Sequence, residues 1–312
     1  MKERLRIFLE SLGRLVSKQL AVCQIRAWKL GLSLEFRDSQ IVVRKDSREI
    51  RISAMHEIYL WDMINYFDYY HDAVFPSTAN CVEFVDYSQP ALHRLKRSGV
   101  EFEFPSLPES DESTDAYVAA LELVPGDAVL DFGAYAGASA YFLSRAVGPE
   151  GLVLSFEPDE TNFRYLQANI ARHDLRNVQP IDKGVWSKTT SLEFQAEGNM
   201  GSSVVSVLGR NTNVKVVNVL SINDAAGLAD KGRVRIAAVK MDIEGAEVEV
   251  LKSAGDFLHR NKPNLVIEPH VVDGRMCTEE ICQLLGSYGY SVQMLSQGIH
   301  NWQLISAKPT AL

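Results

Sequence analysis

The segment that decides the fold is "DAVLDFGAYAGASAYFLSRAV", residues 127–147. It opens with a short apolar run that ends at a turn signal, which predicts a buried strand. Gly133 and Gly137 allow a sharp turn and a close approach of the backbone to a ligand. Residues 138–147 then have the pattern of a helix. A strand that turns into a helix in this way is half of a β-α-β unit, so we expect a parallel sheet covered by helices.

The same alternation continues to the C-terminus. Further strands are expected at residues 152–158, 177–186, 235–242 and 264–270, and helices at 159–173, 278–289 and from the 240s to about 254. Alternating runs within 189–220 predict an inserted hairpin, and residues 291–295 and 301–307 a closing one. Ligands of such sheets bind beyond the carboxyl ends of the strands. The side chains that follow each strand are therefore the first candidates for a site.

Residues 1–110 have a different pattern, which predicts a smaller α+β domain before the α/β domain of residues 111–312. A basic amphipathic helix is expected within 4–30, short antiparallel strands within 32–53 and one aromatic-rich helix over 54–75; the linker is 104–114. Residues 1–30 hold seven Lys or Arg against two Glu. We favour docking of this helix on its own domain or on a second subunit, as in a homodimer; the alternative is an anionic membrane surface.

Composition excludes several classes of protein. The net charge of −8 over 312 residues argues against non-specific nucleic-acid binding. The chain has no run of 18 apolar residues, so we expect no transmembrane segment. Charges interrupt the N-terminus too often for a signal-peptide core. Four scattered cysteines are typical of reduced thiols, so we expect a cytoplasmic location.

Acidic residues at two strand ends indicate the ligand. The glycines form G-x-x-x-G, which is an incomplete dinucleotide fingerprint. Asp131, just before Gly133, suits an ammonium group, and Glu157 can accept both hydroxyls of a ribose. This pair fits S-adenosylmethionine better than a dinucleotide. The chain also lacks Tyr-x-x-x-Lys, which disfavours a short-chain oxidoreductase. Asp182 either holds the adenine amino group or caps a turn.

A second cluster follows the strands at 235–242 and 264–270. Because side chains alternate along a strand, Lys240, Asp242 and Glu244 share one direction, and Glu268 and His270 share another. If the two strands are neighbours, these groups converge, and Asp242 or His270 is the candidate base for an alcohol, with Glu268 orienting the imidazole. A divalent metal on Asp242, Glu268 and His270, of the magnesium or manganese type, is a less favoured alternative, as is a structural ion-pair network.

Two local features near this cluster have simpler interpretations. Gly245 provides a sharp exit from the strand, and Glu247 is placed to interact favourably with the positive end of the next helix, so we treat it as structural. The loop "GNMGSS", residues 198–203, either closes over the acceptor or is an ordinary hairpin turn.

Four segments together resemble the FkbM-type S-adenosylmethionine-dependent methyltransferases: "VLDFGAYAGASA", "LSFEPDETNFRYLQANI", "VKMDIEGAEVEVL" and "LVIEPH". The resemblance spans roughly residues 125–307. It implies a Rossmann-like class I methyltransferase sheet of seven strands with the last antiparallel, and transfer of a methyl group to a hydroxyl of a sugar or secondary metabolite. Phe132 and Tyr135 depart from the residues usual in the family.

The resemblance also assigns residues. The implied cofactor contacts are Asp131, Gly133, Ala134, Tyr135, Gly137, Glu157, Asp182 and Lys183. The implied reaction site lies at the ends of "VKMDIE" and "VIEPH", and the implied partner is a small-molecule or glycan acceptor. Two alternatives are a nucleotide-binding oxidoreductase and a non-catalytic binding module on a Rossmann-like fold.

Overall fold

The computed structural model describes residues 18–37, 39–196, 203–204, 214–229, 234–297 and 302–310. The chain divides into two compact units, Met1–Asp111 and Glu112–Leu312. Most of the N-terminal basic segment, residues 1–17, and the 198–202 part of the proposed closing loop lie outside the described residues. Predictions about their structure therefore stay predictions.

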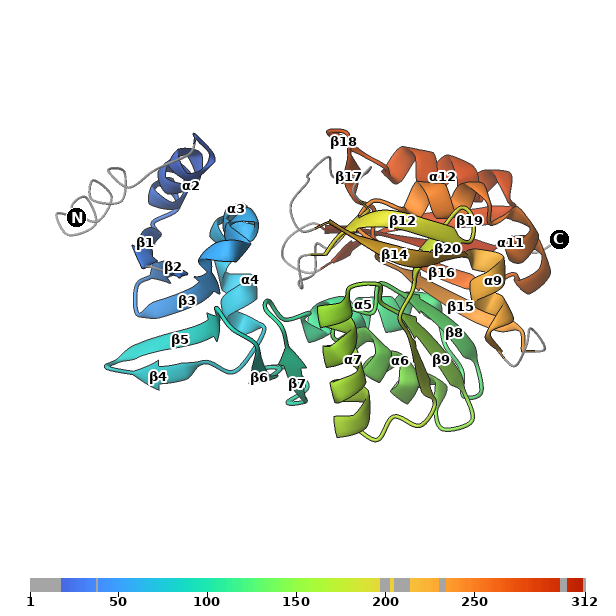
Figure 1. Ribbon diagram of the computed structural model, residues 1–312, viewed down its shortest axis with the longest axis horizontal. Helices are drawn as coiled ribbons and strands as arrows, with labels where there is room; N and C mark the ends of the chain where they lie inside the picture. Colours follow the sequence, from blue (N-terminus) through green and yellow to red (C-terminus); the bar gives the residue numbers. More distant parts are fainter. Residues whose placement is uncertain are drawn as a thin grey trace. The chain divides into compact units, whose positions relative to one another are not determined.

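The first unit is built on a five-stranded sheet in the order β1-β2-β3-β5-β4 (Figure 1). Its strands are β1 (Ser33–Arg37), β2 (Gln40–Lys45), β3 (Arg48–Ser53), β4 (Ser77–Ala79) and β5 (Val82–Tyr87). A hairpin of β6 (Ala91–Arg94) and β7 (Glu101–Phe104) follows, and α2 (Lys18–Lys29) precedes the sheet. As expected, β1, β2 and β3 pair antiparallel.

The aromatic-rich segment is not one helix. It forms η1 (Ala54–Tyr59), α3 (Leu60–Asn65) and α4 (Phe67–Asp72). His56 and Tyr66 have backbone angles outside the helical region, with φ of −99° and −123°. The backbone leaves the helical conformation at these two residues, so the prediction of a single helix over 54–75 is wrong.

The second unit contains the predicted sheet, in the order β10-β9-β8-β15-β16-β20-β19. Its members are β8 (Ala128–Phe132), β9 (Leu152–Phe156), β10 (Val178–Ile181), β15 (Ile236–Met241), β16 (Asn264–Ile267), β19 (Tyr290–Gln297) and β20 (Trp302–Pro309). The first five pair in parallel, and β20 is antiparallel to both of its neighbours. This is the expected Rossmann-like class I methyltransferase sheet, so the fold class is confirmed.

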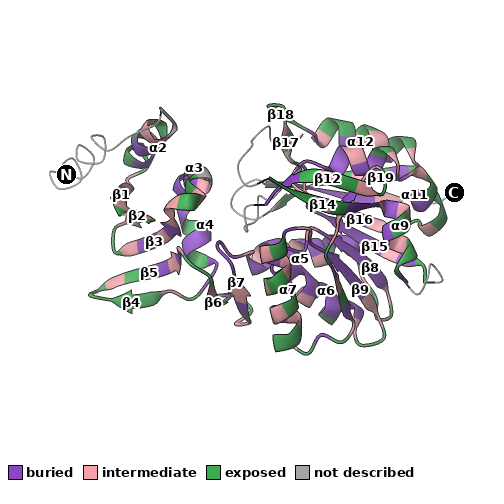
Figure 2. Ribbon diagram, in the orientation of Figure 1, coloured by how far each residue is buried: buried purple, intermediate pink, exposed green. Residues whose placement is uncertain are grey.

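Helices cover both faces of this sheet, and the central strands are its most deeply buried part (Figures 1 and 2). One face packs against α5 (Asp111–Leu121), α6 (Ala138–Val147) and α7 (Glu160–Arg172). The other packs against α9 (Ile222–Gly227), α10 (Glu247–Lys252), α11 (Gly255–Asn261) and α12 (Thr278–Ser287). Within β8, Val129 belongs to the first layer and Leu130 to the second, as strand alternation requires.

One predicted strand is divided, and one helix and one short hairpin were not predicted. Residues 177–186 give β10 and a separate strand, β11 (Gly184–Trp186). β11 joins a smaller sheet, β11-β14-β12-β13, with β12 (Thr190–Gln195), β13 (Ser203–Val204) and β14 (Val214–Ser221). α10 is the helix predicted to end near Ala254; a second helix, α11, follows it, and a short hairpin of β17 (Val271–Val272) and β18 (Arg275–Met276) precedes α12. The antiparallel pair β12 and β14 is the predicted inserted hairpin.

Candidate active site

The register of the central strands brings the first charged pair together. Lys240 of β15 lies opposite Asp131 of β8 in the parallel ladder. Ala238 and Val129, two residues earlier in each strand, belong to the layer beneath α5, α6 and α7. By strand alternation Lys240 and Asp131 project toward the same helices. The sheet therefore places one cation and one anion side by side near its carboxyl edge.

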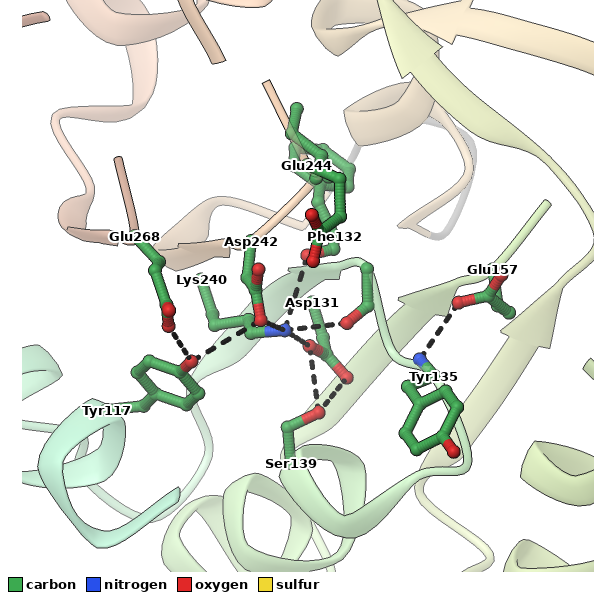
Figure 3. Close-up of polar contacts among 12 residues, drawn as sticks. Tyr117, Asp131, Phe132, Tyr135, Ser139, Glu157, Lys240, Asp242, Glu244 and Glu268 are labelled. Carbon is green, nitrogen blue, oxygen red and sulfur yellow. Dashed lines mark hydrogen bonds and ion pairs between the residues drawn. The ribbon is translucent and has the colours of Figure 1, made fainter. Parts of the chain in front are cut away.

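Asp131 and Lys240 are enclosed, with 0% and 1% of their side-chain surfaces exposed. Their charged atoms Oδ1 and Nζ are 3.7 Å apart. The Ser155 hydroxyl donates to the Asp131 carboxylate at 3.0 Å, and the Ser139 hydroxyl donates to it at 3.2 Å (Figure 3). The expected contact of Asp131 with a cofactor ammonium stays a prediction. Its carboxylate is occupied by protein groups, and Lys240 is its counter-ion.

Lys240 also ties the two strand ends together. Its ammonium group donates to the carbonyl oxygen of Gly133 at 2.6 Å and lies 3.6 Å from Oδ2 of Asp242. It sits 5.3 Å from the ring centre of Tyr117, in α5, within the range of a cation–π contact. The ammonium thus connects the glycine turn after β8 with the acidic turn after β15.

Tyr117 links two of the carboxylates. Its hydroxyl donates to Oε2 of Glu268 at 2.6 Å and also faces Oδ2 of Asp242 at 3.4 Å (Figure 3). Glu268 follows β16, the parallel neighbour of β15, as the sequence predicted. Sequence reasoning missed Tyr117, because it comes from a helix 125 residues before Asp242 and no local pattern distinguishes it.

His270 lies on the other side of Asp242. Its Nε2 is 3.6 Å from Oδ1 of Asp242 and 3.6 Å from Oε1 of Glu244. Its Nδ1 is 2.9 Å from Oε1 of Glu247. The carboxylate that orients the imidazole is therefore Glu247 and not Glu268, which is a correction to the sequence interpretation.

Glu247 has more partners than a helix-capping acid needs. It has no exposed surface, and its Oε1 also accepts from the backbone N–H groups of Ile243 and Gly245, both at 3.2 Å. The Cys277 thiol lies 3.9 Å from Oε2. The structural interpretation of Glu247 was thus incomplete, because this residue fixes both the turn after β15 and the ring of His270.

The crowding of carboxylates changes their acidities. Burial first, and then the neighbouring carboxylate of Asp242, raise the pKa of Glu268 to about 7, and burial raises the pKa of Glu244 to about 8. Burial alone would lower the pKa of His270, but the carboxylates of Glu244, Glu247 and Asp242 raise it well above 6.5. The side chains of Asp242, Glu244 and His270 keep 20–28% of their surface exposed. This part of the cluster is therefore accessible from solvent.

Contacts within the protein explain why Gly133 and Gly137 are glycines. Gly133 has φ of +79°, and a Cβ built there would lie 1.7 Å from the carbonyl oxygen of Asp242. Gly137 has φ of +90°, and a Cβ built there would lie 2.8 Å from Cδ1 of Leu166, in α7. Both glycines make room for protein atoms. The sequence interpretation, which assigned that room to a ligand, missed these contacts.

Glu157, at the end of β9, is fixed by the same turn. One of its carboxylate oxygens accepts the backbone N–H group of Asp159 at 2.8 Å, and the other accepts that of Tyr135 at 2.9 Å (Figure 3). Burial raises its pKa to about 8. The Gly133 and Ala134 N–H groups both donate to the Phe156 carbonyl, which holds the turn against β9. Asp182 and Lys183 directly follow β10, at the carboxyl edge next to Glu157.

Two serines in the site were also missed. Ser139 opens α6, and Ser155 lies in β9 between apolar neighbours. A hydroxyl inside a strand buried on both faces is a usable signal, because it must find a partner there. Ser139 carried no comparable signal.

The cluster also contains a possible set of metal ligands. Among the described residues, Asp242, Glu244 and His270 bring one ligand atom each to within 4.8 Å of the others. The set differs from the one considered from sequence, since Glu268 is engaged by Tyr117.

Comparison with known proteins gives a consistent result. The family model described as "Methyltransferase FkbM domain" matches residues 131–292, just over half of the chain. "Methyltransferase 1" of Beauveria bassiana is 26% identical and aligns with 53% of this chain and 72% of its own length. The "31-O-demethyl-FK506 methyltransferase FkbM" of Streptomyces tacrolimicus is also 26% identical, over 55% of this chain and 75% of its own.

Solved structures are similar at lower levels. The methyltransferase FkbM from Methylobacillus flagellatus has 16% identity and a TM-score of 0.45, and the match covers 93% of this chain. The chain spans only 59% of that protein's length. On the strength of the family model, the chain belongs to the FkbM family of methyltransferases.

Proposed function

We propose that this chain is an S-adenosylmethionine-dependent O-methyltransferase whose acceptor is a hydroxyl of a sugar or secondary metabolite. The observation that carries the proposal is the convergence of Asp242, Glu268 and His270 beyond β15 and β16. This edge is where α/β sheets bind their ligands. Membership of a methyltransferase family supplies the reaction class.

The residues at the other end of the edge fit the cofactor. Glu157 accepts one backbone N–H group on each oxygen and a further hydrogen bond from the Asn162 side chain, and a carboxylate with about four lone-pair sites retains one for a ribose hydroxyl. We propose that the turn of Gly133, Ala134, Tyr135 and Gly137 lines the methionine part of the cofactor, and that Asp182 and Lys183 lie beside the adenine. Asp131 is proposed to act through Lys240 and Gly133, because its own carboxylate is enclosed.

The reaction itself needs alignment and a proton acceptor. The methyl–sulfur bond of the sulfonium breaks as the methyl–oxygen bond forms, with the three atoms in line, so positioning of the hydroxyl accounts for much of the rate. The hydroxyl proton must leave, and Asp242 is the proposed acceptor. His270 is the second candidate, and it can accept a proton only in its neutral form, above its raised pKa. Lys240 keeps the Asp242 carboxylate in place through its 3.6 Å contact.

The class of acceptor is proposed from the name of a relative. One relative's name specifies 31-O-demethyl-FK506 as its substrate, which supports an oxygen acceptor on a natural product. We extend the proposal to small-molecule or glycan acceptors, a cytoplasmic location, no nucleic-acid partner and a homodimer. No helix within the described residues has the length and hydropathy needed to cross a bilayer.

Calorimetry separates this proposal from its rivals. The chain should bind S-adenosylhomocysteine in a one-to-one complex and should not bind NAD(H). Binding of NAD(H) alone would establish the oxidoreductase. A chain that binds S-adenosylhomocysteine but transfers no methyl group to any hydroxyl compound would support the binding module instead.

A further inference from the structure

We propose that one side of α2 binds the surface of an anionic phospholipid membrane. This surface, the outer face of α2, is formed by Val22, Ile25, Trp28 and Lys29. It belongs to the first unit, and the proposal goes beyond methyl transfer. The helix would lie on the bilayer and attach the chain to it without crossing it.

The two sides of α2 differ in exposure. Cys23 and Ala27 are 2% and 0% exposed, because the helix packs against α3 and β1. Val22, Ile25 and Trp28 are 53%, 44% and 50% exposed (Figure 2). Residues three apart on a helix are neighbours on its surface, so these three side chains form one apolar stripe. The described part of the first unit leaves this stripe exposed.

The charge of α2 is entirely positive. The helix contains no Asp or Glu, and Lys29 is one of two basic residues in its last turn. Residues 1–30 have a net charge of +5, whereas the whole chain has −8. Burial first, and then the carboxylates of Glu57 and Asp62, raise the pKa of Cys23, so these acids act on the buried side of the helix. The outer face is therefore apolar and basic, which is the combination that binds anionic lipid.

Trp28 and Lys29 suit the boundary between lipid and water. Tryptophan is enriched at this boundary, because its large ring is apolar and its indole N–H is polar. A lysine can lay its apolar stem along the lipid and place its ammonium group among the phosphates. Both side chains are exposed at the same end of α2. This end of the helix is expected to make the strongest contact with the headgroups.

A second copy of the chain fits the outer face less well. Its three apolar side chains are about half-exposed, and three such side chains present no more than about 400 Å², since even a large one buries at most about 250 Å². A standard protein interface buries about 800 Å² per partner. Pairing through this face would also bring two basic helices together without an acid in either of them. A membrane requires no complementary shape and supplies the opposite charge.

Co-sedimentation of the full chain with sucrose-loaded vesicles tests the surface without any turnover. The vesicles contain either phosphatidylcholine alone or phosphatidylcholine and phosphatidylserine in a ratio of about 2 to 1. We expect affinity for the vesicles with phosphatidylserine to be at least about tenfold higher than for phosphatidylcholine alone. This difference should shrink as added salt screens the charges.

Variants locate the contact on α2. Ile25→Ser and Trp28→Ser together should weaken binding at least about tenfold, because they remove most of the apolar stripe. Lys29→Glu should weaken binding to the vesicles with phosphatidylserine by about tenfold. Leu92→Ser is the matched control, since Leu92 is 47% exposed but lies on β6, far from α2 within the first unit (Figure 1). Its effect should be less than about twofold. All of these side chains are exposed, so the variants should fold, and circular dichroism checks this.

Several results would overturn the proposal. One is a folded chain that does not bind vesicles with phosphatidylserine, and another is equal affinity for both kinds of vesicle. Binding that Ile25→Ser and Trp28→Ser leave unchanged, or weaken no more than Leu92→Ser does, would exclude α2 as the contact. Analytical ultracentrifugation without lipid tests the second copy: a dimer that the paired Ile25 and Trp28 variant dissociates would assign the face to self-association. None of these results depends on methyl transfer, so the proposed function is tested separately.

Discussion

Nζ of Lys240 lies 3.7 Å from Oδ1 of Asp131, and the two side chains face each other across neighbouring strands with almost no exposed surface. A buried charge whose partner is removed is strongly destabilising, by about 3–5 kcal/mol. The pair is therefore expected to contribute to stability as well as to the position of the turns that follow β8 and β15.

A double-mutant cycle tests this pair. Lys240→Met should lower the free energy of unfolding by about 3 kcal/mol or more, because the Asp131 carboxylate loses its counter-ion. Adding Asp131→Asn should recover at least about 1 kcal/mol of that loss. Urea denaturation measures all four free energies. Effects that simply add would show that the two charges are not coupled.

The glycine turn gives a second prediction. In Gly133→Ala, the new methyl group meets the Asp242 carbonyl, so the free energy of unfolding should fall by more than about 3 kcal/mol. Gly274→Ala is the matched control, since Gly274 also has a positive φ, of +76°, but a Cβ added there would meet nothing within 4 Å. Its cost should be the backbone term alone, about 1 kcal/mol. Equal losses in thermal or urea unfolding would contradict the close contact.

The raised pKa of Glu157 predicts that the free energy of unfolding depends on pH. Burial raises its pKa from 4.5 to about 8, so the folded chain holds the proton more tightly than the unfolded chain. The resulting stabilisation is complete below pH 4.5 and is lost as pH rises toward 8, by at most about 1.4 kcal/mol per pH unit. Glu157→Gln carries no such proton, so its unfolding free energy should fall less between pH 5.5 and 7.5. Parallel pH profiles for the two proteins would refute the shift.

Tyr117 gives a prediction for turnover. Tyr117→Phe removes the hydroxyl that joins Glu268 to Asp242, so kcat on a true acceptor should fall about tenfold or more. The affinity for S-adenosylhomocysteine should hardly change. Tyr288→Phe is the control, because it removes a hydroxyl bonded to the Leu251 carbonyl outside the cluster. Comparable losses of kcat in both variants would show that the Tyr117 hydroxyl has no specific role in turnover.

The sheet was predictable because its signals are local. Each of the strands ending near Asp131, Glu157 and Asp242 is a short apolar run that stops at a glycine or an acid. The breaks at His56 and Tyr66, and the division of β10 from β11, were not predictable in this way. They depend on packing around the segment, and the hydrophobic pattern continues through them.

The sequence predicted which residues form the site, but not which hydrogen-bond partner each of them has. Lys240, Asp242, Glu268 and His270 are brought together because strand alternation and neighbouring strands follow simple rules. The partner of His270 is Glu247, whose carboxylate reaches it only because the turn at Gly245 folds back. Tyr117 belongs to a helix that precedes the sheet. Such contacts depend on tertiary packing, which a single sequence does not show.

The most direct test of the proposed function is a structure of the chain with S-adenosylhomocysteine bound. We expect a ribose hydroxyl within about 3.5 Å of the Glu157 carboxylate and the sulfur directed toward Asp242 and Glu268. A ligand bound away from the carboxyl edge of β8 and β9, or a sulfur facing away from Asp242, would contradict the account.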